Sequence, residues 1–308
     1  IRAALLGVLT DRSPLVRAAA AEALGSYQDE ETRDALLAAA GDDYRVVRIS
    51  TAQALSTFPA GAFQGIDLGD FPAAIADYEA YLDVRPDDWL SHYNRGNYYL
   101  NIGRPELAID AYQIAHRLDP NYYPPLVNAS IAYNQVGDNA KAEGSLRTAL
   151  HLEPYSDVVW LNLALLLGEQ GKREEAMEAF GRVFDLDSTS AVAAYNLSVF
   201  YSETDMAQAV EWSGRAASLA PDSPRYSFTH AFYLNQAGDN DRARRVLEGM
   251  IRDYPAYADA YLLLGDVYLV QGKRAQAIQL YEQGLGVAAM PADGRAMIRA
   301  KLEAVRNE

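Results

Sequence analysis

The sequence predicts an all-α fold, an α-solenoid built of stacked helical hairpins. Two sets of residues carry this prediction, because members of each set recur at intervals of thirty-four residues. The first set is Gly103, Gly137 and Gly171, and the second is Asn94, Asn128, Asn162 and Asn196. Such a period is typical of arrays in which one supersecondary unit buries its apolar face against the next copy. The long open surface of an array favours binding over catalysis.

The first residues of the chain have a shorter period of thirty-one. The segment Pro14-Leu15-Val16-Arg17 recurs as Arg45-Val46-Val47-Arg48, and Asp11 and Asp42 open the corresponding turns. Residues 1–58 therefore resemble two short HEAT repeats. In HEAT repeats Asp and Arg side chains commonly form a ladder between adjacent turns, so the resemblance implies structural roles for Arg17 and Arg48.

A junction and a lone helix come next. Residues 59–69 contain Pro59 and several glycines without helical periodicity, which predicts a junction between two arrays. Residues 70–88 match the second helix of the hairpins that follow, with Gly69, Ala74 and Tyr78 in register. The first helix of this hairpin is degenerate.

The hairpin itself is clearest in residues 89–122. Its apolar pattern runs through Tyr93, Gly96 and Tyr99, stops at Gly103, restarts, and ends at Pro120. This pattern predicts a helix, a tight turn and an antiparallel helix. Small residues recur where the two helices approach each other, and large ones alternate with them. Enlarging a small one should cost roughly 1–3 kcal/mol.

These residues resemble the tetratricopeptide repeat (TPR) family, whose pattern is an aromatic, a small residue, an aromatic, a turn glycine, then Ala, an aromatic, Ala and Pro. The resemblance implies a right-handed α-solenoid in which HEAT-like repeats precede a TPR superhelix. Residues 292–308 fit a C-terminal capping helix. The fourth unit is one residue short, with Glu203-Thr204-Asp205 in place of the turn glycine. The six matching units are 89–122, 123–156, 157–190, 191–223, 224–257 and 258–291.

The TPR resemblance places Asn94, Asn128, Asn162 and Asn196 at one position on the concave surface. Asparagine costs roughly half a kcal/mol relative to alanine inside a helix, so four in register indicate a compensating role. One interpretation is a ladder that hydrogen-bonds the backbone of an extended peptide, at a net ~1 kcal/mol per bond. The other interpretation is that each asparagine bonds a neighbouring helix.

Positions beside the asparagines are mostly apolar or aromatic, and Lys and Arg are nearly absent from them. The further candidates for partner binding are Tyr93, Asn97, Tyr195, Phe228 and Phe232. TPR domains that grip a C-terminal carboxylate need cations here, so the resemblance favours an apolar or hydrogen-bonding partner instead. The alternative is that these side chains pack against adjacent helices.

Charge and composition exclude several classes of function. The chain has 27 Lys and Arg against 42 Asp and Glu, a formal net charge of −15, which would repel nucleic acid and anionic lipid. No apolar run approaches the ~20 residues that span a bilayer, so we expect a soluble chain without membrane insertion. Cysteine is absent, and no phosphate loop, nucleophile elbow, zinc-protease or haem-attachment motif occurs. We therefore expect no catalytic residue, no metal and no cofactor, and hence no enzyme.

The order of the parts carries a second resemblance. Two HEAT-like units, a half repeat and a TPR array resemble the C-terminal region of bacterial periplasmic multihaem c-type cytochromes. This resemblance implies a periplasmic or exported docking module for a redox protein, with the cytoplasm as the alternative location. The chain starts at Ile1 inside a helix-like stretch, so we expect a fragment or a processed chain.

Two functions remain open. The first is a non-enzymatic protein–protein interaction scaffold that binds a partner or an extended peptide on the concave TPR surface; the partner would be a c-type cytochrome or another protein. The second is a self-assembling structural protein in which copies of this chain form an oligomer or fibre by solenoid stacking. The 21 tyrosines of the sequence are the reason to keep the second.

Overall fold

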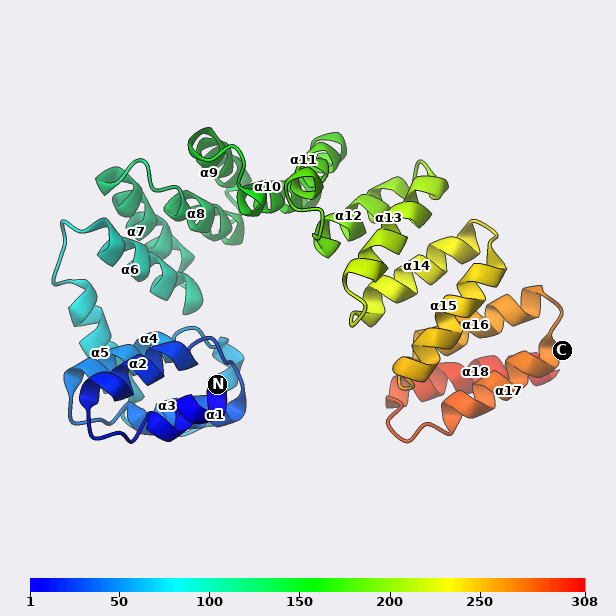
Figure 1. The fold of residues 1–308 in the computed structure, drawn as a ribbon, viewed down its shortest axis with the longest axis horizontal. Helices are drawn as coiled ribbons and strands as arrows, with labels where there is room; N and C mark the ends of the chain where they lie inside the picture. Colours follow the sequence, from blue (N-terminus) through cyan, green and yellow to red (C-terminus); the bar gives the residue numbers. More distant parts are fainter. Residues whose placement is uncertain (308) are drawn as a thin grey trace. The chain divides into compact units, whose positions relative to one another are not determined.

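The computed structural model describes residues 1–307, and helices joined by short turns make up this part of the chain (Figure 1). Residue 308, the last of the predicted capping helix, lies outside the described residues. No β-strand occurs between residues 1 and 307, so the all-α prediction is confirmed. The chain divides into two compact units, Ile1–Tyr155 and Ser156–Glu308.

Unit 1 begins with four helices of the HEAT-like region and continues with a lone helix and two hairpins. Helices α2 and α4 pack together, α4 also packs against α5, and α7 packs against α8 of the next hairpin. Its elements are α1 (Arg2–Val8), α2 (Pro14–Leu24), α3 (Glu30–Ala39), α4 (Arg45–Leu55), the 3-10 helix η1 (Ala60–Phe63), α5 (Phe71–Leu82), α6 (Trp89–Asn101), α7 (Pro105–Leu118), α8 (Pro124–Gln135) and α9 (Asn139–Leu152).

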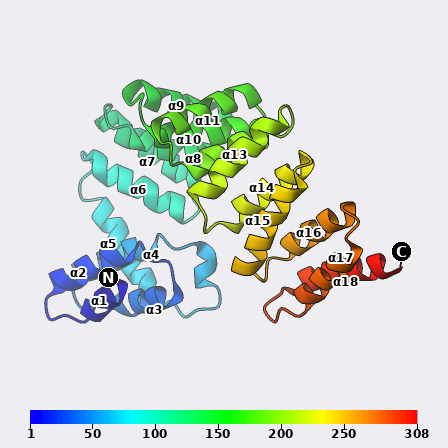
Figure 2. The same ribbon diagram turned by 45° about the vertical axis from the view of Figure 1, so that its right-hand side comes forward.

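Unit 2 consists of four hairpins and a terminal helix. Each helix packs against the next one in the chain, and α18 lies against both α16 and α17 (Figure 2). There α18 buries Ile298, Leu302 and Val305 on the last apolar face. The elements are α10 (Asp157–Glu169), α11 (Arg173–Leu186), α12 (Ala191–Tyr201), α13 (Met206–Leu219), α14 (Pro224–Gln236), α15 (Asn240–Asp253), α16 (Ala258–Val270), α17 (Arg274–Leu285) and α18 (Ala292–Asn307).

An Asp–Arg ladder runs through the HEAT-like region, as the resemblance implied. Arg17 Nε and Nη2 donate to the two carboxylate oxygens of Asp42 at 2.7 and 2.9 Å. Arg48 Nε donates to Asp77 Oδ2 at 2.7 Å, and its Nη1 donates to the backbone oxygen of Asp42 at 2.8 Å. These bonds hold the pKa of both carboxyl groups below the usual value. Because Asp77 belongs to α5, the ladder continues beyond the HEAT-like repeats.

The turns inside the hairpins explain the recurring glycine. Gly103 has φ +72°, a left-handed conformation that glycine adopts without steric cost, and the backbone N–H of Arg104 donates to Tyr99 O at 2.8 Å. The fourth unit turns differently, as its missing glycine suggested. Its helix α12 ends at Tyr201, and the Asp205 carboxylate caps α13 by accepting two backbone N–H groups.

The small residues that recur in the sequence lie where the two helices of a hairpin pack against each other. Ala108 and Ala115 are fully buried, and Gly96 lies directly under the ring of Tyr112. A β-carbon on Gly96 would lie 2.4 Å from Tyr112 Cε1, so no larger residue fits there without displacement. This close approach fixes the Tyr112 ring and, through it, the site described next.

Candidate binding site

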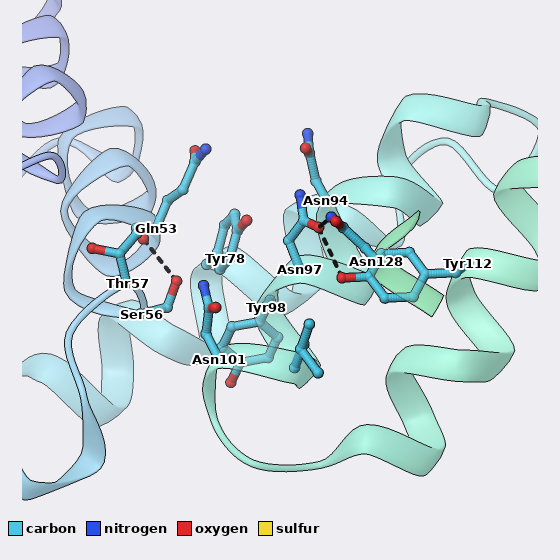
Figure 3. A pocket seen from close by; sticks show the side chains of 11 residues that line it. Gln53, Ser56, Thr57, Tyr78, Asn94, Asn97, Tyr98, Asn101, Tyr112 and Asn128 are labelled. Atoms are coloured by element: carbon cyan, nitrogen blue, oxygen red, sulfur yellow. Dashed lines mark hydrogen bonds between the residues drawn. The ribbon is translucent and has the colours of Figure 1, made fainter. Parts of the chain in front are cut away.

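A pocket of about 400 Å³ opens in unit 1 between the HEAT-like helix α4 and the TPR helices (Figure 3). All of its lining residues are uncharged at neutral pH, although 22% of the chain is charged. Most of them are amides, hydroxyls and tyrosines. The lining residues are Gln53, Ser56, Thr57, Tyr78, Asn94, Asn97, Tyr98, Leu100, Asn101, Tyr112 and Asn128.

Three hydrogen bonds fix two of the asparagines. Asn97 Oδ1 accepts from Tyr112 Oη and from Asn128 Nδ2, both at 2.8 Å (Figure 3). Asn128 Nδ2 also donates to Tyr93 Oη at 3.2 Å. Both lone pairs of Asn97 Oδ1 and both hydrogens of Asn128 Nδ2 are thereby used. Asn97 keeps its Nδ2 donor and Asn128 keeps its Oδ1 acceptor; neither is bonded within the described part of the chain.

Three tyrosines form the apolar body of the pocket. Tyr112, Tyr78 and Tyr98 are 1%, 3% and 4% exposed, and the rings of Tyr78 and Tyr98 meet edge to face at 5.5 Å. Burial raises the pKa of each phenol above its ordinary value of 10, so the hydroxyls are neutral at physiological pH. The pocket therefore presents neutral donors and acceptors on a buried aromatic base.

The four asparagines in register do not share one environment. Asn94 lines the pocket and makes no side-chain hydrogen bond within residues 1–307. Asn128 bonds the neighbouring helix α6, as the second interpretation expects. Asn162 and Asn196 lie in unit 2 and instead donate to carbonyl oxygens of their own helices, Val158 O at 2.8 Å and Val192 O at 2.9 Å.

The predicted aromatic residues divide in a similar way. Tyr93, Tyr195 and Phe228 are half-buried. Each packs against an aromatic ring that precedes or begins the first helix of the next hairpin. The pairs are Tyr93 with Tyr122 at 5.7 Å, Tyr195 with Tyr226 at 5.0 Å, and Phe228 with Tyr257 at 5.6 Å. Phe232 is 38% exposed. These contacts favour the packing alternative for the first three rings and leave Phe232 accessible.

Several pocket residues have no counterpart among the predicted candidates. Gln53 and Thr57 come from the HEAT-like end of the unit, Tyr78 from α5, and Asn101 from the last turn of α6. Tyr78 matches a packed position of the TPR pattern, so the pattern predicts a packing role for it and not a place in the pocket lining. The periods of the two arrays differ, so repeat register cannot predict that residues of α4 and α6 line one pocket.

Comparison with known proteins identifies both kinds of repeat. Tetratricopeptide repeat models match residues 66–123, 158–190 and 234–302, and a HEAT repeat model matches residues 1–56. The chain thus carries TPR repeats, with HEAT repeats at its N-terminal end. The resemblance to multihaem cytochromes has no counterpart among these matches.

The relatives and neighbours are distant. Protein O-mannosyl-transferase TMTC3 of Homo sapiens is 25% identical over 201 residues, 64% of this chain and 22% of that protein. TPR repeat-containing protein YpiA of Bacillus subtilis is 23% identical over 218 residues, 70% of this chain and 51% of that protein. The chain therefore spans about a fifth and about half of the length of these relatives.

Solved structures show the same fold. A tetratricopeptide repeat protein from Parabacteroides merdae has a TM-score of 0.53 at 20% identity, covering 71% of this chain and 87% of its own. Pseudomonas aeruginosa pilF has a TM-score of 0.54 at 20% identity, covering 70% and 99%. YrrB, described as a TPR protein with an unusual peptide-binding site, has a TM-score of 0.53 at 16% identity, covering 64% and 99%.

The described residues contain neither a metal-binding cluster nor a membrane-spanning helix. Over residues 1–307, no group of three or more His, Cys, Asp and Glu side chains is arranged to hold a metal ion. None of the helices that the structure describes has the length and apolar character needed to cross a bilayer.

Proposed function

We propose that this chain, with its HEAT and TPR repeats, is a non-enzymatic scaffold that binds an extended peptide segment of a partner protein. TPR-repeat proteins generally mediate protein–protein interaction, which supports the general role. Within unit 1, the first helices of the TPR hairpins, α6 and α8, receive the segment, and the uncharged pocket is its principal contact.

The arrangement of Asn97 and Asn128 carries this proposal. Asn97 offers a fixed N–H donor and Asn128 offers a fixed oxygen acceptor, on adjacent helices of one pocket. An amide group of the bound segment, in its backbone or in a side chain, has a carbonyl that accepts and an N–H that donates, so it complements this pair. Each bond adds a net ~1 kcal/mol, so binding needs further contacts, for which Asn94 and Asn101 are available.

Selection from a random linear-peptide display library against the immobilised chain tests the proposal. Enriched peptides are then titrated by fluorescence anisotropy against wild type and two variants. Asn94→Ala should weaken binding and leave stability unchanged or slightly higher, because Asn94 bonds nothing in the described chain and alanine favours the helix by ~0.5 kcal/mol. Asn128→Ala should lose both binding and ~1–2 kcal/mol of stability, because it breaks two internal bonds.

Asn162→Ala is the matched control. Its amide bonds its own helix in unit 2, so the change should leave stability and pocket binding near the wild-type values. Equal peptide affinity for wild type, Asn94→Ala and Asn128→Ala would refute the role of the pocket. Selection of no peptide at all would refute the peptide-binding function.

The order of HEAT and TPR repeats supports a narrower proposal, that the partner is a multihaem c-type cytochrome and that the chain works in the periplasm. Surface plasmon resonance against multihaem cytochromes purified from the source organism tests the partner. Immunoblotting of periplasmic and cytoplasmic fractions tests the location. Absence of saturable binding, or signal confined to the cytoplasmic fraction, would remove the corresponding part.

A further inference from the structure

We infer that the pocket of unit 1 binds a carboxamide side chain, that of a Gln or Asn residue of the bound segment. The inference rests on the proposed function and specifies which side chain the partner brings to the pocket. Three groups carry it: the hydroxyl of Tyr78, the amino group of Asn97 and the amide oxygen of Asn128, all in the pocket wall (Figure 3).

The hydroxyl of Tyr78 is the observation that points to a ligand. Tyr78 is 3% exposed, lines the pocket, and makes no side-chain hydrogen bond within residues 1–307. Its ring is fixed edge to face against Tyr98 and packs in one cluster with Ala52, Ala74 and Leu82. The hydroxyl is not sealed in the core, as that of Tyr281 is, but opens into the pocket. Because the ring cannot swing out to solvent, the hydroxyl is a donor available to a bound group.

The repeat shows why this hydroxyl is free. Tyr112 occupies the same position thirty-four residues later, and its hydroxyl donates to Asn97 on the first helix of its own hairpin. Tyr78 has no such helix before it, because the 3-10 helix η1 and the junction stand in its place. The pocket lies where that missing helix would have supplied a partner.

The three groups match a carboxamide. Tyr78 and Asn97 both donate, so they suit a carbonyl oxygen with its two lone pairs, and Asn128 Oδ1 suits the attached NH₂. A carboxylate has no hydrogen for Asn128 Oδ1 and finds no cation in the lining. An ammonium group offers no acceptor to Asn97. A sugar would satisfy the polar groups, but the tyrosine rings expose 4% or less of their surface, which leaves no ring face for stacking.

The opposite wall is provided by the HEAT-like helix α4 (Figure 3). Ser56 Oγ donates to Gln53 O at 2.7 Å, and Thr57 Oγ1 donates to Gly25 O at 2.9 Å. These bonds hold the two hydroxyls in place, and the Gln53 amide stays available beside the pocket. The site therefore requires both kinds of repeat.

Propionamide, which reproduces the end of a glutamine side chain, is the probe for this inference. Titration of the full chain, followed by the side-chain amide signals of Asn94 and Asn101 in NMR spectra, should give a saturable shift with a Kd on the order of 10 mM, as expected for so small a ligand. Sodium propionate and methylammonium chloride should give none. Equal or tighter binding of propionate or of methyl glucoside, or no saturable shift with propionamide, would overturn the inference.

Two variants separate binding from folding. Tyr78→Phe removes one hydroxyl that has no partner in the described chain, so the melting temperature should not fall while propionamide binds at least tenfold more weakly. Tyr281→Phe is the matched control: its hydroxyl also lacks a partner in the described chain, but it lies in unit 2 and outside the pocket lining, so propionamide affinity should be kept. Asn97→Asp keeps the acceptor for Tyr112 and Asn128 but replaces the donor, and should abolish binding at neutral pH. Wild-type affinity in Tyr78→Phe would refute the assignment.

The peptide selection distinguishes this inference from the function on which it rests. Selected peptides enriched in Gln or Asn, with binding lost in Tyr78→Phe, would support both. Selected peptides without that enrichment would overturn the carboxamide assignment and keep the peptide-binding function. If no peptide is selected, the function is refuted, and a saturable propionamide shift still supports the chemistry of the pocket.

Discussion

Replacing Gly96 with alanine tests the packing that holds the pocket together. The added β-carbon would lie 2.4, 2.5 and 2.9 Å from three ring atoms of Tyr112, whereas carbon atoms pack favourably at about 3.5–4.0 Å. The ring would have to move by about 1 Å. Tyr112 is 1% exposed and its hydroxyl holds Asn97, so the ring cannot move without disturbing that asparagine.

The expected loss follows from two opposed effects. Overpacking of a confined ring costs up to ~3 kcal/mol, and alanine regains ~1 kcal/mol of helix propensity over glycine. The net destabilisation in urea denaturation is therefore up to about 2 kcal/mol, which would lower the melting point by at most roughly 4–8 °C. Propionamide binding should weaken as well, because displacement of Tyr112 releases the Asn97 amide from its fixed position.

Gly144→Ala provides the control for this experiment. Gly144 lies inside helix α9, and a β-carbon there would meet nothing within 4 Å. The same glycine-to-alanine change should therefore stabilise the chain by up to ~1 kcal/mol. If Gly96→Ala proves as stable as wild type, the close approach of α6 and α7 is wrong, and the geometry of the pocket must be reconsidered.

Three further predictions address the ladder, a turn and a histidine. Asp77→Ala should lower the free energy of unfolding by about 1 kcal/mol, because it removes the partner of partly exposed Arg48. Urea denaturation measures this change. A variant as stable as wild type would show that the ladder ends within the HEAT-like repeats. Gly171→Ala should cost ~1–2 kcal/mol, because φ is +71° there, and its melting curve checks this. Burial, with a contribution from Arg242, lowers the pKa of His230 below its ordinary 6.5, so the folded chain binds this proton less readily than the unfolded chain. The free energy of unfolding should therefore fall as the pH drops below about 6.5, and His230→Gln should flatten this dependence.

The hairpins could be predicted from the sequence because their determinants are local. Gly96, Tyr112 and Gly103 lie within one repeat, and each has a physical reason to be small, large or left-handed at its position. The missing glycine likewise marked the fourth unit as different, and there the chain turns through bonds from the backbone N–H groups of Thr204 and Asp205 to Tyr201 O, at 3.0 and 2.7 Å. Local sequence patterns thus determine the hairpins, because a hairpin closes within about thirty residues.

The pocket could not be predicted, because it depends on contacts between segments with unrelated periods. Register placed four asparagines in one row, yet the hydrogen-bond partner of each depends on the residue that faces it. Asn128 faces Asn97, whereas Ile131 and Leu165 occupy the Asn97 position in the next two hairpins and offer no acceptor. Asn162 accordingly bonds its own helix.

Tyr78 and Tyr281 occupy the repeat position of Tyr112, but neither makes the hydrogen bond that Tyr112 makes to Asn97. Tyr281 occupies the same repeat position as Tyr112 and packs against Gly265 as Tyr112 packs against Gly96. Asp266 takes the place of Asn97 but accepts from Lys301 on the terminal helix, and Tyr281 Oη is buried without a partner. The Tyr281 hydroxyl is thus enclosed within a capped end. Tyr78 loses its partner for a different reason, the absent first helix, and its hydroxyl lies at an open pocket. The open hydroxyl of Tyr78 can reach a ligand, whereas the enclosed hydroxyl of Tyr281 cannot. The binding site therefore lies at the junction of the two arrays and not at the C-terminal cap.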